Sequence, residues 1–173
     1  MTMTNATNPT NVSVRRAHPG DSASIAHVHV RAWQEAYAHL VPAEKLAALD
    51  VAARAASWER VLGDKTTEVW VAEVVLSEGV EVVGWASAGP GRGSNAPRPL
   101  ELEGIYVLAA HHGSGVGQAL CDAAIGASEA FLWMAADNPR AENFYRRNGF
   151  ELDGATDRYA LLGTEVDIVR FVR

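Results

Sequence analysis

A glycine-rich turn at residues 111–118 is the part of this sequence whose residue types best suit the binding of an anion. It reads His-His-Gly-Ser-Gly-Val-Gly-Gln and lies between a predicted strand ending at Val107 and a predicted helix beginning near Gly115. Glycines clear side chains from the approach, and the free N–H groups and dipole of a helix N-terminus favour negative charge. The turn therefore predicts a pyrophosphate site, although close packing of a strand on a helix would explain an isolated turn equally well.

Two common nucleotide motifs do not fit this turn. No Lys-Ser or Lys-Thr pair follows the glycines, which argues against a Walker loop and nucleotide hydrolysis. The glycine spacing also differs from the G-x-G-x-x-G of dinucleotide-binding folds, and the preceding strand is predicted to be antiparallel. Nicotinamide chemistry is therefore disfavoured as well.

Three side chains outside the turn could move protons. Glu101 and Glu103 lie two residues apart in a predicted strand, so both are on one face and either could accept a proton from an ammonium group through water. Carboxylates near a surface are often only solvated, so this role stays open. Tyr145 shares one helical face with Ala141 and Phe144, and its spacing alone predicts a core residue.

Strands and helices must hold these residues, and hydrophobic periodicity predicts where they form. We expect strands at about 12–14, 67–73, 81–88, 100–107 and 130–136, and two more toward the end, the last at about 166–172. We expect helices after residue 21, at about 42–62, at about 115–127, and from Pro139 to Gly149. The segment 89–99 has many helix and strand breakers and is expected to be a mobile surface loop. This order favours an α/β or α+β fold with helices on both faces of a mixed sheet.

The composition narrows the class of protein. The chain has 173 residues, 48% of them hydrophobic, which suits one domain at 12–173 after a flexible N-terminal tail at 1–11. The net charge of -6 is spread along the chain without a basic stripe, which argues against a nucleic-acid partner. No segment has the apolar length of a membrane span, and a single cysteine excludes an internal disulfide framework. We therefore expect a cytoplasmic protein with no membrane partner.

Two segments resemble motifs of the GCN5-related N-acetyltransferase (GNAT) family. Residues 112–117 resemble its pyrophosphate turn, Gln/Arg-x-x-Gly-x-Gly/Ala, and residues 138–150 resemble its segment Asn-x-x-Ala-x-x-Phe-Tyr-x-x-x-Gly-Phe. The resemblance covers roughly residues 12–173. His112 stands where the family usually has Gln or Arg, and Ser114 stands where a basic residue is common.

The resemblance implies a fold and a co-substrate. The fold is a single-domain, mixed and mostly antiparallel sheet of about seven strands, splayed at its centre. The co-substrate is acetyl-CoA, and no metal is expected because adjacent histidines point apart. The positions that match the family's cofactor contacts are Tyr106, Val107, His112, Gly113, Ser114, Gly115, Val116, Gly117, Gln118, Asn138 and Asn143. For Asn138, a helix N-cap before Pro139 is an alternative that needs no ligand.

The resemblance also implies catalytic roles. The backbone N–H groups at Tyr106 and Val107 would polarise the thioester, and Tyr145 would act as the general acid toward the sulfur of CoA. A phenol with a pKa of about 10 can donate a proton to a thiolate of similar basicity. Glu101 or Glu103 would be the base.

The acceptor is expected to bind beside the first two helices. Trp33 and Tyr37 are the candidate substrate contacts, and the loop 89–99 is an equally plausible lid. Cys121 is expected to be buried and inert, because the family transfers acetyl directly. The predicted function is N-acetylation of a small-molecule amine. The alternatives are a protein N-terminal or lysine acetyltransferase and a non-catalytic CoA-binding sensor, and a homodimer is plausible from family habit.

Overall fold

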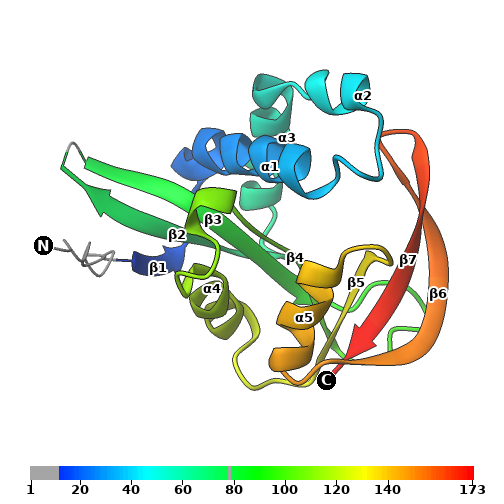
Figure 1. Ribbon diagram of the computed structural model, residues 1–173. Helices are drawn as coiled ribbons and strands as arrows, with labels where there is room; N and C mark the ends of the chain where they lie inside the picture. The colour runs from blue at the N-terminus through cyan, green and yellow to red at the C-terminus, as the bar shows by residue number, and fades with distance from the viewer. Residues whose placement is uncertain (1–11, 78) are drawn as a thin grey trace, which may run out of the picture.

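The protein is built on one seven-stranded sheet. The computed structural model describes residues 12–77 and 79–173, and the tail predicted at 1–11 lies outside this part of the chain. The strands lie in the order β1-β2-β3-β4-β5-β7-β6, and each neighbouring pair is antiparallel except β4 and β5 (Figure 1). This arrangement confirms the predicted mixed, mostly antiparallel sheet. The elements in chain order are β1 (Val12–Arg16), the 3-10 helix η1 (Pro19–Asp21), α1 (Ser22–Ala36), α2 (Ala43–Ala47), α3 (Val51–Gly63), β2 (Glu68–Leu76), β3 (Gly79–Pro90), β4 (Leu100–Val107), the 3-10 helix η2 (Ala109–His111), α4 (Val116–Ile125), β5 (Ala130–Ala135), α5 (Pro139–Arg147), β6 (Glu151–Leu161) and β7 (Thr164–Val172).

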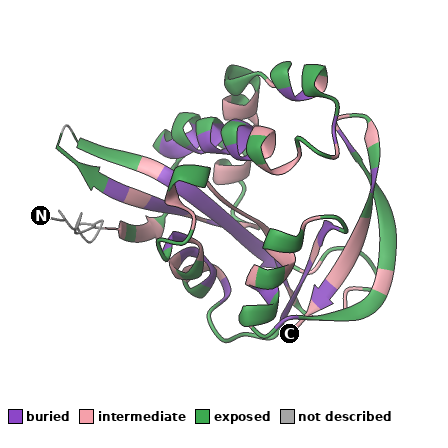
Figure 2. Ribbon diagram, in the orientation of Figure 1, coloured by how far each residue is buried: buried purple, intermediate pink, exposed green. Residues whose placement is uncertain are grey.

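Helices cover both faces of the sheet, as predicted. On one face, α1 and α3 bury a cluster that includes Ile25, Trp58 and Trp85. On the other face, α4 packs on the strands through Val116 and Leu120, and the central strands between the two layers are buried (Figure 2). Burial of each large apolar side chain contributes about 1.5–3 kcal/mol. The two clusters hold α1 and α4 rigidly on either side of β4.

The sheet splays between β4 and β5. Within the described residues, these parallel strands pair at Leu100–Ala130 and Glu101–Phe131 only, after which β4 continues with β3 and β5 with β7 (Figure 1). The register between β3 and β4 shifts so that Glu103 is an extra residue in β4. Such a bulge bends its strand. The bend lies just where β4 leaves β5, and it confirms the predicted splay at the centre of the sheet.

The single helical stretch predicted at about 42–62 is in fact two helices. The first, α2, ends at Ala47, and α3 begins one residue after Asp50. The Asp50 carboxylate accepts hydrogen bonds from the N–H groups of Ala52 and Ala53 at 2.7 and 3.2 Å. Because an aspartate in this position competes with the helical backbone bonds, it ends one helix and caps the next.

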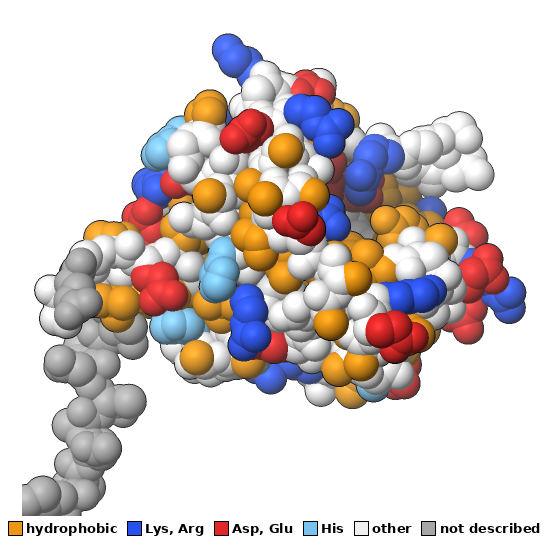
Figure 3. Space-filling view, turned by 90° about the horizontal axis from the view of Figure 1, so that it is seen from above, with side chains coloured by type: hydrophobic (Ala, Val, Ile, Leu, Met, Phe, Trp, Pro, Cys, Tyr) orange, Lys and Arg blue, Asp and Glu red, His pale blue; other side chains and the backbone are white. Residues whose placement is uncertain are grey.

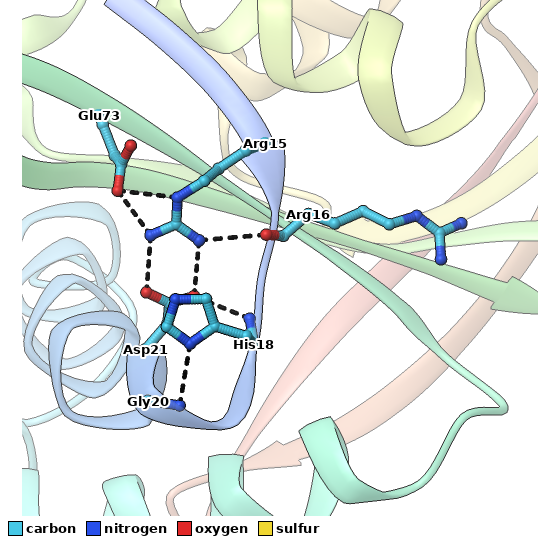
Figure 4. A network of polar contacts seen from close by, with 6 residues as sticks. All are labelled: Arg15, Arg16, His18, Gly20, Asp21 and Glu73. Carbon is cyan, nitrogen blue, oxygen red and sulfur yellow. Dashed lines mark hydrogen bonds and ion pairs between the residues drawn. The ribbon is translucent and has the colours of Figure 1, made fainter.

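An ion-pair network fastens the start of α1 to the sheet (Figure 4). The guanidinium of Arg15 in β1 donates to both Asp21 carboxylate oxygens at 2.8 Å and to Glu73 in β2 at 2.6 and 3.0 Å. The buried Asp21 side chain also accepts the N–H of His18 at 2.8 Å. The hydrogen bonds from Arg15 hold the pKa of the Asp21 carboxyl below its usual value. Asp21 therefore stays ionised at neutral pH and anchors the helix that forms one wall of the site.

The outer surface carries charges of both signs. Seen from above, Lys and Arg side chains are interspersed with Asp and Glu (Figure 3). This face therefore differs from the basic stripe of a nucleic-acid-binding protein. Over the part of the chain that the structure describes, every helix is too short or too polar to cross a membrane.

Candidate active site

A cleft of about 1090 Å³ opens where β4 and β5 separate. Its walls come from α1 and the residues after it, from β4 and β5, from the glycine turn, and from α5. Of the residues expected to contact a cofactor, the following line the cleft: Tyr106, Val107, His112, Gly113, Gly115, Gly117, Gln118, Asn138 and Asn143. Val116 is fully buried under the sheet, and Ser114 is exposed with its hydroxyl donating to the His111 carbonyl oxygen at 2.6 Å. The splay and the motif residues thus meet in one place.

The glycine turn presents the N-terminus of α4 to the cleft. Gly113 and Gly115 have φ values of 77° and 90°, a region that side-chain-bearing residues rarely adopt. A Cβ at either position would meet no described atom within 4 Å, so the space above the turn is open. Gly115 is also the N-cap of α4 and has no side chain to occupy the first N–H groups of that helix. The turn therefore fits a pyrophosphate group by its backbone alone.

His112 has a different task from the one expected of its motif position. Its Nε2 atom is 2.8 Å from the carbonyl oxygen of Val107, so the ring fastens the turn to the end of β4 instead of reaching toward an anion. The sequence could not predict this contact, because the hydrogen bond depends on how the turn folds back onto β4.

The N–H of Val107 points toward the separated side of β4. The next residue, Leu108, donates its N–H to the Val83 carbonyl oxygen in β3 at 3.0 Å. Because successive residues of a strand direct their N–H groups to opposite edges, the N–H of Val107 faces the β5 side and that of Tyr106 faces β3. Of the two backbone positions predicted to polarise a thioester, Val107 has the geometry for it.

Two of the predicted ligand contacts also have structural tasks. The side-chain oxygen of Asn138 accepts the N–H of Ala141 at 3.2 Å and caps α5, which is the alternative expected from Pro139. The side-chain amide of Gln118 donates to Asn148 at 2.7 Å and joins α4 to α5. Both residues still line the cleft, so these tasks are compatible with ligand contact.

Tyr145 combines a buried ring with a position in the cleft wall. The ring packs against Phe144, Phe150 and Phe171 and is 8% exposed. Burial raises the pKa of its hydroxyl far above the ordinary value. The phenol is therefore fully protonated at neutral pH and can act as a proton donor.

The structure separates the two carboxylates of β4. Glu101 is buried outside the cleft lining, and it accepts hydrogen bonds from the Arg92 backbone N–H and Nε at 3.0 Å and from Nη2 at 2.7 Å. Glu103 lines the cleft, where it accepts a hydrogen bond from the Thr67 hydroxyl at 3.2 Å. Arg92 Nε is 3.9 Å from Glu103. Glu103 is thus the carboxylate that a ligand in the cleft can reach.

The expected lid at 89–99 is fastened elsewhere. Gly89 and Pro90 belong to β3, and the Gly91 N–H donates to the Pro99 carbonyl oxygen at 2.8 Å. Arg92 ties the segment to Glu101, and the whole segment lies outside the cleft lining. The prediction that this segment is a mobile lid is therefore wrong. The ion pair between Arg92 and Glu101, which the Gly/Pro pattern does not reveal, fixes the segment outside the cleft lining.

The two predicted acceptor residues lie in different layers. Tyr37 lines the cleft, and its hydroxyl is 2.7 Å from that of Tyr106. Trp33 lies behind this wall, with its ring 4.6 Å from His29 and the Arg54 guanidinium 5.3 Å from its centre. Burial lowers the pKa of His29 to about 3, so this histidine is a neutral core residue.

Several cleft residues were missed from the sequence. They are Glu35 in the last turn of α1, His39 just after that helix, and Arg140 and Arg147 on α5. Glu35 and His39 lie outside the two motifs, and Arg140 and Arg147 occupy variable positions of the second motif. Single charged residues at such positions are common on any surface. Only the spatial arrangement identifies them.

The positions of the histidine, acidic and cysteine side chains bear on metal binding and on thiol chemistry. Within residues 12–77 and 79–173, no three His, Cys, Asp or Glu side chains gather as a metal site would require. Cys121 is a buried residue of α4, and burial raises the pKa of its thiol to about 11. A thiol with this pKa is a poor nucleophile at neutral pH.

Comparison with known proteins agrees with the fold. The model of the acetyltransferase (GNAT) family matches residues 25–150. An N-acetyltransferase of Bacillus subtilis, YuaI, is 31% identical over 134 residues, which are 74% of each chain. The PaiA N-acetyltransferase from Thermoplasma acidophilum, solved with coenzyme A, superimposes with a TM-score of 0.65 at 15% identity over 92% of this chain and 98% of its own. YncA from Salmonella typhimurium, solved with acetyl-CoA, gives 0.64 at 22% identity over 95% and 94%.

The fold, the cleft and these similarities define the class of protein together. The chain belongs to the GNAT family of acetyltransferases, as its two motifs indicated, and its class of activity is that of an acyltransferase.

Proposed function

We propose that this protein transfers an acetyl group from acetyl-CoA to the amine of a small molecule. One observation carries the proposal: the backbone of the glycine turn and the free edge of β4 open into the same cleft. A thioester carbonyl and a pyrophosphate each need backbone N–H donors, and here both kinds of donor are available side by side. The related structures that contain coenzyme A or acetyl-CoA support the assignment of the co-substrate.

The residues of the turn would hold the co-substrate. The N–H groups at Gly115 and the start of α4 would bind the pyrophosphate, and Asn138 and Asn143 would contact the pantetheine arm. Acetyl-CoA supplies an acetyl group activated as a thioester, whose C–S bond breaks as the amine nitrogen forms the amide bond. The Val107 N–H would stabilise the negative charge that develops on the carbonyl oxygen, an effect worth about 2.7–4 kcal/mol for a single donor in other acyl-transfer sites.

Two side chains would move the protons. The Glu103 carboxylate would take a proton from the ammonium group of the acceptor, directly or through water, because it is the carboxylate of β4 that lines the cleft. The Tyr145 hydroxyl would give its proton to the departing sulfur, because it lines the cleft and is protonated across the neutral range. Glu101 would instead hold Arg92 and the segment after β3 in place.

The test is a calorimetric titration with acetyl-CoA, paired with release of free thiol in the presence of amines. We expect one site per chain with a Kd of about 1–100 μM. Gly115→Ala is expected to weaken binding about tenfold or more, because an alanine at this φ is strained and its methyl group occupies the open space above the turn.

Gly154→Ala is the matched control. Gly154 has a φ of 86° with open space around its missing Cβ, but it lies in β6. Its replacement carries the same backbone strain and should leave the affinity unchanged. Absence of binding by the parent chain would overturn the proposal, and equal weakening by the two variants would remove the turn from it.

The remaining expectations belong to the same proposal. A cytoplasmic location is supported by the single, buried and free cysteine, which suits a reducing compartment. The proposal of a homodimer is based on the resemblance to the family alone. A protein N-terminus or lysine as acceptor, and a CoA sensor without turnover, are the outcomes that the thiol-release assay separates from the small-molecule enzyme.

A further inference from the structure

The cleft has two halves with different chemistry. We call the part lined by α1, the residues just after α1 and the middle of β4 the acceptor half. Its polar lining consists of Glu35, Tyr37, His39, Glu103 and Tyr106. The part lined by the glycine turn and α5 is the cofactor half, and the cleft-lining arginines, both from α5, belong to it.

The segment that joins α1 to α2 bounds the acceptor half through Tyr37 and His39, and we call this segment together with α2 the cover. On one side, His39 Nε2 forms a hydrogen bond with the Asp137 carbonyl oxygen in the β5–α5 connection. On the other side, Lys45 donates to the Gly163 carbonyl oxygen at 3.0 Å and to the Thr164 hydroxyl at 2.9 Å, in the turn between β6 and β7. The segment thus bridges two elements far apart in the sequence, and α2 lies against the tip of the β6–β7 hairpin (Figure 1).

Apolar packing fixes this cover. The side chains of the α1–α2 region and of the β6–β7 hairpin form one buried cluster, made of Val41, Leu46, Leu161 and Val166. Two hydrogen-bonded ends and a buried centre make the cover part of the folded structure. An extended peptide acceptor needs an open groove, whereas this half suits a compact molecule.

Among the described residues, the charged side chains that line the acceptor half are both acidic. Over the described residues, its charged lining is Glu35 and Glu103, and no lysine or arginine side chain lines it. Arg31 and Arg92 approach these carboxylates to 3.7 and 3.9 Å, but both lie outside the lining and are more than half exposed. A bound ammonium group would meet a carboxylate, whereas a carboxylate or phosphate on the acceptor would be desolvated without a cationic partner.

We infer that the acceptor is a small amine that carries no carboxylate or phosphate group, such as an aralkyl monoamine or an aliphatic diamine. Glu103 faces the ammonium group that is to be acetylated, and Glu35 favours further positive charge near the end of α1. The rings of Tyr37 and Tyr106 supply apolar surface for the carbon skeleton. The inference rests on the proposed function and narrows its substrate.

Matched pairs of amines test this inference. Tyramine is compared with tyrosine, and cadaverine with lysine, so that each pair differs only by a carboxylate. A short peptide with N-terminal alanine represents a protein acceptor. Release of free thiol from acetyl-CoA gives kcat/KM for each compound. We expect the member without a carboxylate to exceed its partner by about tenfold or more, which is the effect of about 1.4 kcal/mol of unpaired charge.

A variant ties the preference to the acceptor half. Glu35→Gln removes a charge but keeps the side-chain oxygen that accepts the Ala109 N–H at 3.0 Å, so the end of α1 stays in place. We expect the cadaverine-to-lysine ratio to fall about threefold or more in this variant. Glu142→Gln removes an exposed carboxylate of α5 outside the lining and should leave the ratio unchanged.

The outcomes separate the two proposals. Failure of the chain to bind acetyl-CoA in calorimetry overturns the proposed function itself. Turnover of the peptide alone, or no turnover of any compound, overturns the proposed function and the substrate inference together. Binding of acetyl-CoA with turnover of small amines, but with equal or better turnover of tyrosine and lysine, overturns the substrate inference only.

Discussion

The cofactor half and the acceptor half of the cleft are built in opposite ways. The cofactor half comes from short contiguous segments, the glycine turn at 111–118 and the helix after Asn138, whose backbone geometry defines the binding groups. The acceptor half is assembled from the end of α1, the middle of β4, the β5–α5 connection and the β6–β7 hairpin. A local motif can describe the first half, but only tertiary packing produces the second.

The two halves differ in which amino-acid substitutions they can tolerate. In the proposed function, binding by backbone N–H groups would require glycine at a few positive-φ positions and would leave neighbouring side chains free, so His112 and Ser114 could depart from the family pattern. Binding by side chains such as Glu35 and Glu103 changes with each substitution. The acceptor half is therefore the place where specificity within this fold can differ from one protein to another.

The largest expected effect lies in the cofactor half, at Tyr145 on α5. Tyr145→Phe removes the proton donor while keeping the ring that packs on Phe150 and Phe171. We expect kcat to fall roughly 10²- to 10³-fold, with the affinity for acetyl-CoA unchanged in calorimetry. Tyr159→Phe, in an exposed position of β6, should leave kcat unaffected. Undiminished turnover by Tyr145→Phe would remove the assignment of the general acid.

The next effect distinguishes the two carboxylates of β4. Glu103→Gln should lower kcat/KM about 10²-fold, because the ammonium group loses its proton acceptor. Glu101→Gln should instead lower the free energy of unfolding by about 1–3 kcal/mol, since three hydrogen bonds to Arg92 weaken. Steady-state kinetics and urea unfolding on both variants make the comparison. A larger kinetic loss in Glu101→Gln would reverse the assignment of the base.

The sequence was sufficient to predict the fold class and to identify most of the motif residues that line the cleft. The glycine pattern and the Asn138 to Phe150 segment are local, so their residues come together once the strand and helices are placed correctly. Three features depend on side-chain contacts that hydrophobic periodicity does not describe. They are the ion pair between Glu101 and Arg92, the contact between His112 and Val107, and the break between helices at Asp50. The same is true of Glu35 and of the cover over the acceptor half.

The third prediction concerns Asp21, which anchors α1, one wall of the acceptor half. Asp21→Asn should lower the free energy of unfolding at neutral pH by about 2 kcal/mol, because Arg15 loses its charged partner at the start of α1. The pKa of Asp21 is lowered in the folded state, so its stabilising effect is present above the ordinary pKa of 3.8 and is lost as the pH falls through the folded-state value.

Urea unfolding of the parent chain and of Asp21→Asn at neutral pH and in acid checks this dependence. The difference between the two should shrink as the pH falls below the ordinary pKa of 3.8. Glu165→Gln, which breaks an exposed pair with Arg158, should cost less than about 1 kcal/mol at any pH. A difference for Asp21→Asn that does not change with pH would show that charge at this position is irrelevant.

The smallest expected effect asks whether His112 acts on the thioester end or on the phosphates of the cofactor half. The His112 ring forms a hydrogen bond with the carbonyl oxygen of Val107. The N–H of the same Val107 faces the cleft. His112→Ala should therefore lower kcat about tenfold, or about 1.4 kcal/mol, through a less well-positioned N–H, while the Kd for acetyl-CoA stays within about twofold. His112→Gln restores a side-chain N–H donor and should recover part of kcat. A weakened Kd with an unchanged kcat would instead show that His112 acts on the phosphates, as the Gln or Arg of the family pattern implied.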